Sequence, residues 1–415
     1  MTKLTDLKWF CPQPFINTVI NIDGVTKPCC VLKEWPNNKI RRDGYAAPLD
    51  MHHSKLMKDF RNEFLDNKGP GPLIKKYCQV CIEQEKHSVV DSHRSIYLDK
   101  FNSESGEYKK ELDFLEEYID SDFNDPFYIT MEYNAPDNFC NLRCNMCNAM
   151  NSSSLARENK NIGVEERKNF LGEKIHYKED DDVEKYTEIF KNLIELKLVG
   201  GETLAIKQNY DMIQHAVDLG LSEKMKLVIT TNATLTPKFN DKDIFDYIPL
   251  FKECQINVSV EFWGDKNNYM RFPSKWETIM SNVKKVSKMP RTRILFATTV
   301  NSLNIGYLNE VAIGVDSLKR EIGQTVVPGK SKSTDLYCDF ATGSLVWGIG
   351  NLYCVSAIPL DIREKYIDKY YDPEQSPVRH HQTFYKLVSY LETMPFDEEM
   401  HKKMMMDVQT RYKYR

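Results

Sequence analysis

The chain has 415 residues, of which 41% are hydrophobic and 28% are charged, and its formal net charge is -4. This composition is typical of a globular protein that is long enough for two domains or for one large barrel with additions. The small net charge gives no overall attraction to nucleic acid or to an anionic membrane, and no stretch of the sequence is apolar enough to span a bilayer.

The first residues lack the apolar segment of a signal peptide, so we expect a cytoplasmic protein. Thiols stay reduced in that compartment. The eleven cysteines therefore indicate metal binding rather than disulfides.

Four cysteines in the first hundred residues form a pattern of their own. Cys11, Gly24 and Cys29 have the spacing C-x12-G-x4-C, and Cys78 and Cys81 follow as a C-x2-C pair. The Asp-Gly pair that contains Gly24 follows an apolar run and is a strong hairpin signal. Such a hairpin would bring the segments that carry Cys11 and Cys29 towards each other.

Two kinds of metal centre fit these four thiolates. They suffice to hold an iron–sulfur cluster with no open corner, and they also suit a tetrahedral zinc site such as a zinc ribbon. Cys30 is adjacent to Cys29 and is an alternative ligand, but the spacing from Gly24 favours Cys29.

From residue 126 onward, strand and helix patterns alternate. The strand candidates cover residues 127–133, 196–199, 227–231, 256–261, 294–299 and 352–356. Helical patterns lie between them, over residues 183–193, 275–288 and 305–313. Six such units imply a parallel sheet with right-handed crossovers. An open doubly wound sheet and a partial TIM-like barrel both fit this alternation.

Directly after the first strand candidate, Cys140, Cys144 and Cys147 have the spacing C-x3-C-x2-C. A cluster of four irons and four sulfides has four corners, which thiolates usually fill. Because this loop supplies three ligands, one iron would stay open to a small molecule, as catalytic zinc keeps an open position. A structural zinc site is the alternative, but no His or Cys follows at zinc-module spacing.

Glycine or polar residues also lie at or just after the ends of the next four strand candidates. They are Gly200, Gly201 and Glu202, then Asn232, then Ser259, Glu261 and the downstream Arg271, and finally Asn301. Glycines allow the backbone to approach a ligand closely, whereas an Asn can equally form a turn or cap a helix. Each of these signals is weak singly, and their order and spacing together are a stronger one.

The three-cysteine loop and these segments closely resemble the signature of the radical S-adenosylmethionine (radical SAM) enzymes. Met146 departs from the family pattern, which often has an aromatic residue there, and Thr203 replaces the usual Pro. The resemblance implies a partial (βα)6 TIM-like barrel in which the open iron binds the amino and carboxylate groups of S-adenosylmethionine. Reductive cleavage of this cofactor then yields a 5'-deoxyadenosyl radical, which abstracts hydrogen from a substrate.

The resemblance also implies a cofactor contact for each segment. Gly200, Gly201 and Glu202 would contact the methionine amino group, and Arg271 the methionine carboxylate. Ser259 and Glu261 would meet the ribose hydroxyls, although Asp is commoner than Glu at the second position. Asn232 would line the site, and Asn301 would support adenine and ribose.

The N-terminal cysteines resemble the twitch domain, the short form of the SPASM module, which binds one auxiliary four-iron four-sulfur cluster. This resemblance implies Cys11, Cys29, Cys78 and Cys81 as ligands of a cluster that transfers electrons or anchors the substrate. Twitch and SPASM modules usually follow the barrel, whereas this one precedes it.

The remaining cysteines and the paired histidines show no ligand spacing. Cys254, Cys338 and Cys354 are expected to be buried small hydrophobic residues, although Cys338 could also donate hydrogen or ligate a cluster. His52-His53 and His380-His381 are expected on the solvated surface. The basic tail 411–415 is likewise expected to be solvated and gives no clear sign of nucleic-acid binding.

The expected organisation is a twitch/SPASM-like module over 1–95, a charged linker over 96–125, the radical SAM barrel over 126–375 and a C-terminal helical cap over 376–415. The predicted function is a radical SAM enzyme with an electron donor such as flavodoxin or ferredoxin. Its substrate, a peptide, a protein or a small metabolite, and its catalytic residues are unassigned. The alternative is a non-catalytic iron–sulfur electron-transfer or zinc-stabilised binding protein, which would not need an open iron corner.

Overall fold

The structure of the protein is a computed structural model. It describes residues 4–22, 25–32, 35, 48–66, 69–86, 92–102, 106, 108–123, 128–135, 137–164, 183–322, 334–341, 353–371 and 384–415. By their internal contacts the residues divide into two compact units. The first contains Met1–Asp137, Ile175–Gly200 and Gln208–Leu227, and the second contains Asn138–Lys174, Gly201–Lys207 and Val228–Arg415.

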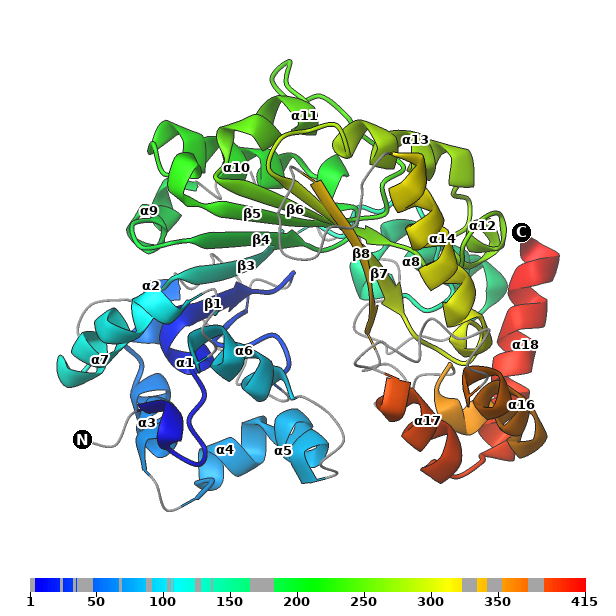
Figure 1. The fold of residues 1–415 in the computed structure, drawn as a ribbon, viewed down its shortest axis with the longest axis horizontal. Helices are drawn as coiled ribbons and strands as arrows, with labels where there is room; N and C mark the ends of the chain where they lie inside the picture. Colours follow the sequence, from blue (N-terminus) through cyan, green and yellow to red (C-terminus); the bar gives the residue numbers. More distant parts are fainter. Residues whose placement is uncertain are drawn as a thin grey trace. The chain divides into compact units, whose positions relative to one another are not determined.

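The strands of the described residues have the order β2-β1-β3-β4-β5-β6-β7-β8 in the sheet (Figure 1). Their bounds are β1 Asn17–Ile20, β2 Thr26–Lys27, β3 Thr130–Asn134, β4 Glu195–Val199, β5 Lys226–Thr231, β6 Glu253–Ser259, β7 Thr292–Thr299 and β8 Thr334–Ala341. Within the first unit, β1 pairs in parallel with β3 and β3 with β4, whereas β2 pairs antiparallel with β1. Within the second unit, β6, β7 and β8 are parallel. The predicted α/β class with a mostly parallel sheet is confirmed.

Helices alternate with these strands. Up to residue 162 they are η1 Leu4–Asp6, α1 Gln13–Ile16, α2 Pro48–His52, α3 Lys55–Leu65, α4 Pro72–Tyr77, α5 Gln79–Lys86, α6 His93–Asn102, η2 Lys109–Glu111, α7 Leu112–Asp120, η3 Ala149–Asn151 and α8 Ser153–Ile162. From residue 183 to residue 270 they are η4 Val183–Tyr186, α9 Thr187–Phe190, η5 Thr203–Ala205, α10 Lys207–Asp218, η6 Ser222–Lys224, α11 Ile244–Tyr247, η7 Ile248–Leu250 and α12 Lys266–Met270. The last are α13 Trp276–Val286, η8 Ile305–Tyr307, α14 Leu308–Glu321, η9 Val355–Ala357, α16 Leu360–Tyr371, α17 Phe384–Thr393 and α18 Glu398–Tyr414. None of these helices combines the length and the apolar character that crossing a membrane requires.

The last predicted strand is wrong. Strand β8 covers Thr334–Ala341, where no strand was predicted, and the predicted strand at 352–356 instead leads into the short helix η9. Val355 and Ile358 pack with Val300 and Ile305 in one buried cluster. The segment is therefore apolar because it packs beneath the turn that follows β7, and not because it pairs in the sheet.

His52 lies in the core of the first unit. The sequence had predicted a surface position for the His52-His53 pair, and this prediction is wrong for His52. His52 is 0% exposed, and its Nδ1 is 2.9 Å from Nη2 of the buried Arg61. Its Nε2 is 3.2 Å from the carbonyl oxygen of Phe123. A neutral ring that carries its proton on Nε2 accepts from the arginine and donates to the carbonyl. His53 is exposed, and the predicted pair His380-His381 lies outside the described residues.

We expect this buried histidine to make the protein less stable as the pH falls. Burial, reinforced by the charge of Arg61, lowers the pKa of His52 from 6.5 to about 3. Because the folded state holds the neutral ring, its contribution is complete above about pH 6.5 and is lost as the pH falls towards the folded pKa. The uptake of one proton on unfolding corresponds to a slope of about 1.4 kcal/mol per pH unit in the free energy of unfolding.

Urea unfolding of the metal-free protein between pH 7.5 and 5.5 measures this slope. The variant His52→Gln, which cannot be protonated, should show a flatter dependence than the unmodified chain. The exposed His53→Gln is the matched control and should leave the slope unchanged. Equal slopes in the unmodified chain and in His52→Gln would contradict the assignment.

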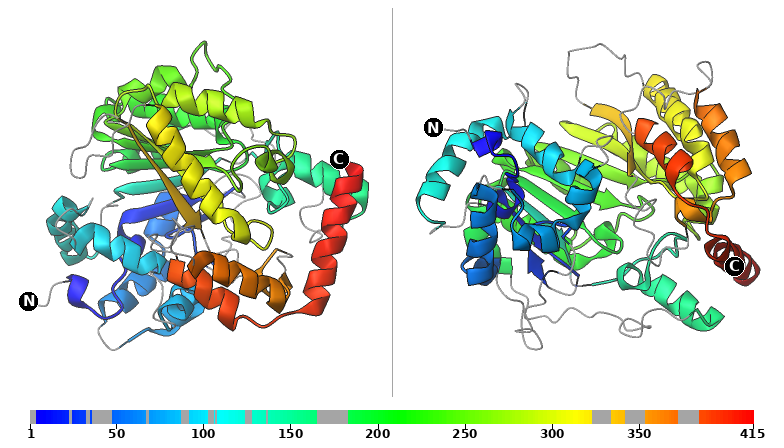
Figure 2. Two further views of the ribbon diagram at one scale, coloured as in Figure 1. Left: turned by 45° about the vertical axis from the view of Figure 1, so that its right-hand side comes forward. Right: turned by 90° about the horizontal axis from the view of Figure 1, so that it is seen from below.

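The last helices of the second unit pack against earlier segments of the same unit. Buried residues of α14, α16 and α17 form one apolar cluster. Helix α18, drawn in red, lies beside α8 (Figure 2), and its Asp407 accepts a hydrogen bond of 2.5 Å from the hydroxyl group of Tyr353. The helical pattern predicted beyond residue 376 is thus present as α17 and α18.

Candidate functional site

The loop that follows β3 brings its three cysteines together. Cys140 and Cys144 are buried, Cys147 is half-buried, and the three pack with Leu142 and Met146 in one cluster. Burial raises the pKa of Cys140 to about 12 and that of Cys144 to about 11. The free thiols are therefore protonated at neutral pH, and binding of a metal would release these protons. Three sulfur atoms in one cluster, two of them on buried residues, fit the donor set of an iron–sulfur cluster.

Hydrogen bonds hold this loop on both sides. The amide groups of Arg143 and Asn145 donate to the carbonyl oxygens of Phe272 (2.6 Å) and Met270 (2.9 Å). On the other side, the Ser152 hydroxyl donates to the Leu142 carbonyl at 2.7 Å while it also caps the start of α8. These hydrogen bonds give the loop a defined shape, which is a requirement for a preorganised metal site.

Gly201 is needed where its segment approaches the cysteine loop. A Cβ atom at this position would lie 2.2 Å from the carbonyl oxygen of Phe139, a backbone atom that cannot swing away. The same carbonyl accepts a hydrogen bond of 2.7 Å from the amide group of Glu202. Gly200 has φ +113°, a conformation that side chains rarely adopt. For steric reasons, both positions of the predicted motif therefore favour glycine.

We expect Gly201→Ala to displace the cysteine loop. Overpacking of this kind costs about 1–3 kcal/mol of stability, and the displaced sulfur atoms should hold iron less well. Iron content after anaerobic reconstitution, together with urea unfolding, checks this expectation. Gly163→Ala is the control, because a Cβ there has no neighbour within 4 Å; it should reduce stability slightly and retain the iron. Full iron content in Gly201→Ala would contradict this account.

Glu202 is fully buried and bound to the segment that follows β5. Its Oε1 accepts from the Thr231 hydroxyl (2.5 Å) and the Leu204 amide (3.2 Å), and its Oε2 accepts from the Asn232 amide (2.8 Å). Burial nevertheless raises the pKa of this carboxyl group. A carboxylate offers about four acceptor positions, so three bonds leave room for one further donor.

Asn232 forms a turn and also contacts the cysteine loop. Its Oδ1 accepts from the amide of Thr234 at 2.9 Å, and its Nδ2 donates to Oδ1 of Asn141 at 3.0 Å. The next residue, Ala233, has φ +56°. This left-handed backbone is one that glycine adopts more readily than alanine. The structure thus shows the turn role that the sequence left open.

Glu261 and Arg271 face each other in a buried ion pair. Nη2 of Arg271 donates to Oε1 of Glu261 at 2.8 Å, and Nε donates to Oε2. The third nitrogen, Nη1, is 3.7 Å from the sulfur of Cys144. Burial alone would lower the pKa of Arg271, but the carboxylate of Glu261 and the nearby sulfur raise it, so the guanidinium stays charged. The structure thus joins two residues to which the sequence assigned separate cofactor contacts.

Asn301 closes the turn after β7. Its Oδ1 accepts from the amide of Leu303 at 2.9 Å, and its Nδ2 donates to the carbonyl of Thr299 at 3.0 Å. Ser259 is the half-buried last residue of β6 and is paired with Ala297 of β7. Asn301 therefore shapes the backbone at the ends of these strands, where Ser259 also lies.

A buried charge cluster, which was not predicted from the sequence, lies behind the cysteine loop. Glu158 of α8 is 1% exposed and binds Arg411 (2.7 Å) and Arg415 (2.8 Å). Arg415 also donates to Oδ1 of Asn145 at 2.5 Å and to the carbonyl of Arg143. The expectation of a solvated tail is therefore wrong for Arg411 and Arg415. No local pattern could reveal these contacts, because the partners are more than 250 residues apart.

We expect Arg415→Ala to loosen the cysteine loop. The variant removes donors to Asn145 and Arg143 and leaves the buried Glu158 with less compensation, so stability should fall by about 1–3 kcal/mol. The reconstituted variant should also lose iron faster to a chelator. The neighbouring Lys413 is exposed, and Lys413→Ala should match the unmodified chain. Identical iron loss in both variants would show that Arg415 does not support the loop.

A second group of cysteines lines one cavity in the first unit. Its lining includes Cys11, Cys29, Cys78, Cys81, His93 and Arg94. Strands β1 and β2 form the predicted hairpin, with Ile20 opposite Thr26, while Gly24 lies outside the described residues. Burial raises the pKa of Cys11 to about 12, and the charge of Cys81 adds to this effect. The structure thus brings together the four cysteines of the N-terminal pattern.

Arg94 organises this cavity. It donates to both carboxylate oxygens of Glu85, at 2.9 and 2.7 Å, and to the carbonyl of Phe10 at 3.0 Å. Glu85 belongs to α5, which also carries Cys81, and Phe10 precedes Cys11. The arginine therefore connects two of the cysteine-bearing segments.

Two of the three remaining cysteines agree with their prediction. Cys254 is 0% exposed and Cys354 is 4% exposed. The backbone of Cys338 lies in β8, but its side chain is outside the described residues. His93, a histidine that the sequence did not single out, lies next to Cys30.

One family model matches the chain: residues 136–314 match the radical SAM superfamily. No curated protein is similar enough to the chain to count as a match. The matched region contains the three-cysteine loop and all of the segments from Gly200 to Asn301, and it excludes the N-terminal cysteines. The family implies a four-iron four-sulfur cluster, S-adenosylmethionine and a source of electrons, and the convergent sulfur atoms fit that cluster. Residues 136–314 therefore carry a radical SAM domain.

Proposed function

We propose that Cys140, Cys144 and Cys147 hold a four-iron four-sulfur cluster and that S-adenosylmethionine binds at its open iron. The observation that carries this proposal is the packing of three thiols in one loop held by hydrogen bonds, with Nη1 of the charged Arg271 at 3.7 Å from the sulfur of Cys144. When bound, the cluster would supply the electron that cleaves S-adenosylmethionine to a 5'-deoxyadenosyl radical. The radical would abstract hydrogen from a peptide, a protein or a small metabolite.

The polar residues around the loop would orient the cofactor. Glu202 has one acceptor position left for the methionine amino group, and Arg271 is the cation for the methionine carboxylate. Gly200 and Gly201 let their backbone approach closely. Ser259 and Glu261 would meet the ribose, and Asn232 and Asn301 would support the site through the turns that they form.

In this proposal Arg271 serves two partners. Its Nε and Nη2 are bound to Glu261, whereas Nη1 points towards Cys144. A guanidinium presents five N–H donors in a fixed fork, so donors remain for a carboxylate of the cofactor. Glu261 keeps the charge and the orientation of that fork.

We further propose a second four-iron four-sulfur cluster, held by Cys11, Cys29, Cys78 and Cys81 in a twitch-like module. Its support is the single cavity that all four residues line. With four thiolates this cluster would have no open iron, so it would transfer electrons or anchor the substrate. An electron donor such as flavodoxin or ferredoxin would reduce the protein.

The proposed organisation assigns these two centres to different segments. The auxiliary module occupies residues 1–95 and the linker residues 96–125. The radical SAM barrel occupies residues 126–375, and the helical cap covers residues 376–415.

Metal analysis and product analysis test these proposals separately. Anaerobically reconstituted protein should contain about eight irons per chain, the content of two cubanes. About four irons with one zinc would contradict the auxiliary cluster. Reduced protein incubated with S-adenosylmethionine should form 5'-deoxyadenosine. No product from a fully reconstituted cluster would favour a non-catalytic electron carrier.

A further inference from the structure

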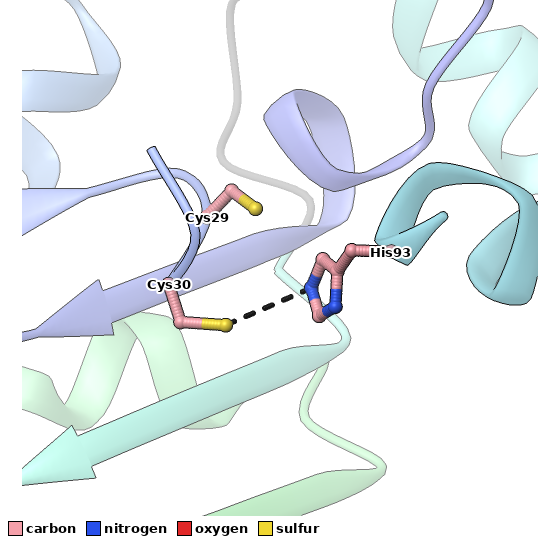
Figure 3. A group of neighbouring side chains, drawn as sticks. All are labelled: Cys29, Cys30 and His93. Carbon is pink, nitrogen blue, oxygen red and sulfur yellow. Dashed lines mark hydrogen bonds between the residues drawn. The ribbon is translucent and has the colours of Figure 1, made fainter. Parts of the chain in front are cut away.

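Cys29, Cys30 and His93 form a compact group of metal-ligating atoms that the four-cysteine cluster does not explain. Their donor atoms all lie within 4.8 Å of one another, and Sγ of Cys30 is 3.7 Å from Nε2 of His93. Figure 3 shows the two sulfur atoms and the imidazole ring pointing into one space. The cysteines follow strand β2, and His93 begins helix α6.

The separation between Cys30 and His93 is close to that of two ligands on a single ion. Zinc lies about 2.3 Å from sulfur and about 2.0–2.1 Å from nitrogen, and tetrahedral angles then place sulfur and nitrogen about 3.5 Å apart and two sulfurs about 3.8 Å apart. The observed 3.7 Å between Cys30 and His93 is close to the first of these values. Ligands of a cubane bind different irons and therefore stand further apart.

The backbone around the three donors is fixed by other residues. Nζ of Lys27 donates to the Cys30 carbonyl at 2.8 Å, and Nδ2 of Asn17 donates to the carbonyl of Pro28, directly before Cys29, at 3.0 Å. On the segment that carries His93, the preceding residue is Ser92, and its hydroxyl group donates to Glu85 at 2.5 Å. Such supporting contacts are characteristic of metal sites whose ligands are held in place.

The adjacent residues Cys29 and Cys30 have different surroundings. Cys29 is buried and lines the cavity of the four cysteines, whereas Cys30 is half-buried and lies against His93. Within the described part of the chain, no fourth Cys, His, Asp or Glu joins this group. Because Cys30 and His93 are partly exposed, water can reach the remaining coordination position.

We propose that Cys29, Cys30 and His93 bind one thiophilic divalent ion such as Zn²⁺, with water in the fourth position. Two thiolates and one imidazole are a ligand set that zinc accepts, and an open fourth position is known for zinc sites. Because Cys29 is also a ligand of the proposed auxiliary cluster, the ion and that cluster exclude each other. This last consequence rests on the proposed function, whereas the zinc site itself does not.

The zinc site is tested first in a chain that cannot build the auxiliary cluster. Cys78→Ser/Cys81→Ser removes two of its ligands and keeps Cys29, Cys30 and His93. With the Cys140 loop reconstituted with iron and sulfide, this variant should retain one added equivalent of zinc. X-ray absorption at the zinc edge should show two sulfur ligands and one imidazole. A site with sulfur ligands alone, or no retained zinc, would overturn the proposal.

His93→Ala in the same background is the decisive change. It should weaken zinc retention at least tenfold in competition with a chelator, because one of three protein ligands is lost. His53→Ala, at an exposed histidine of the same unit, is the matched control and should retain zinc fully. Equal retention in the two variants would show that His93 is not a ligand.

The unmodified chain tests whether the zinc ion and the auxiliary cluster exclude each other. One equivalent of zinc added before reconstitution should lower the iron content from about eight to about four per chain, and 5'-deoxyadenosine should still form. Eight irons together with one bound zinc would show that the two centres do not share Cys29. If about four irons are found without added zinc, the auxiliary cluster fails, while the zinc measurements on the variants still decide the new site.

Discussion

Replacing Cys144 by alanine should abolish the formation of 5'-deoxyadenosine and leave the N-terminal metal centre in place. Two thiolates from a three-cysteine loop cannot hold a cubane that has only three protein ligands. Cys144 is also the sulfur nearest to the guanidinium of Arg271, at 3.7 Å, so the substitution removes a ligand at the centre of the site. Iron should fall by about four per chain, the content of one cubane.

Iron analysis and chromatography of the reaction products measure this result. Cys254→Ala is the matched control, since Cys254 is an equally buried cysteine of the second unit that belongs to neither proposed centre. It should lose some stability, retain its iron and form product. Retained cleavage in Cys144→Ala would disprove the ligand assignment.

Replacing Arg271 by methionine should destabilise the protein and also prevent productive cofactor binding. The substitution leaves the carboxylate of Glu261, which is 0% exposed, without its partner. Removing one member of a buried ion pair costs about 3–5 kcal/mol, because the other charge stays buried and uncompensated. The loss should appear as a lower urea midpoint of the metal-free protein.

A second substitution separates stability from function. Arg271→Met/Glu261→Met removes both charges, and replacing a buried pair by apolar side chains is often neutral. The double variant should therefore recover most of the lost stability, yet it should still fail to cleave S-adenosylmethionine, since the guanidinium of Arg271 no longer lies beside Cys144. Recovery of cleavage together with stability would show that the pair is structural and has no role towards the cofactor.

Local chemistry explains which features could be predicted. A strand needs a few apolar residues in sequence, and the strands β3 to β7 lie at or close to their predicted positions. The three-cysteine spacing is likewise local, because one loop carries all of the ligands. Gly201 could be recognised as special, and the structure adds the reason, a carbonyl oxygen 2.2 Å from where its Cβ would be.

The features that were missed depend on contacts between distant segments. His52 was expected at the surface because nothing near it in the sequence shows that Arg61 and Tyr128 surround it. Arg415 belongs to a polar tail, yet its partner Glu158 lies on α8. The segment 352–356 has a strand-like composition, but it packs beneath the turn after β7.

The amino-acid sequence alone determines the chemistry of this protein: three cysteines spaced for one cluster, four more in an N-terminal pattern, and glycines and polar residues after successive strands. These properties depend on residue type and short spacing. The tertiary structure decides how the groups are combined: Glu261 pairs with Arg271, and Cys30 pairs with His93 beside the four-cysteine cavity. Such pairings depend on packing across tens to hundreds of residues, because burial requires each charge or donor to find a partner wherever the fold places one.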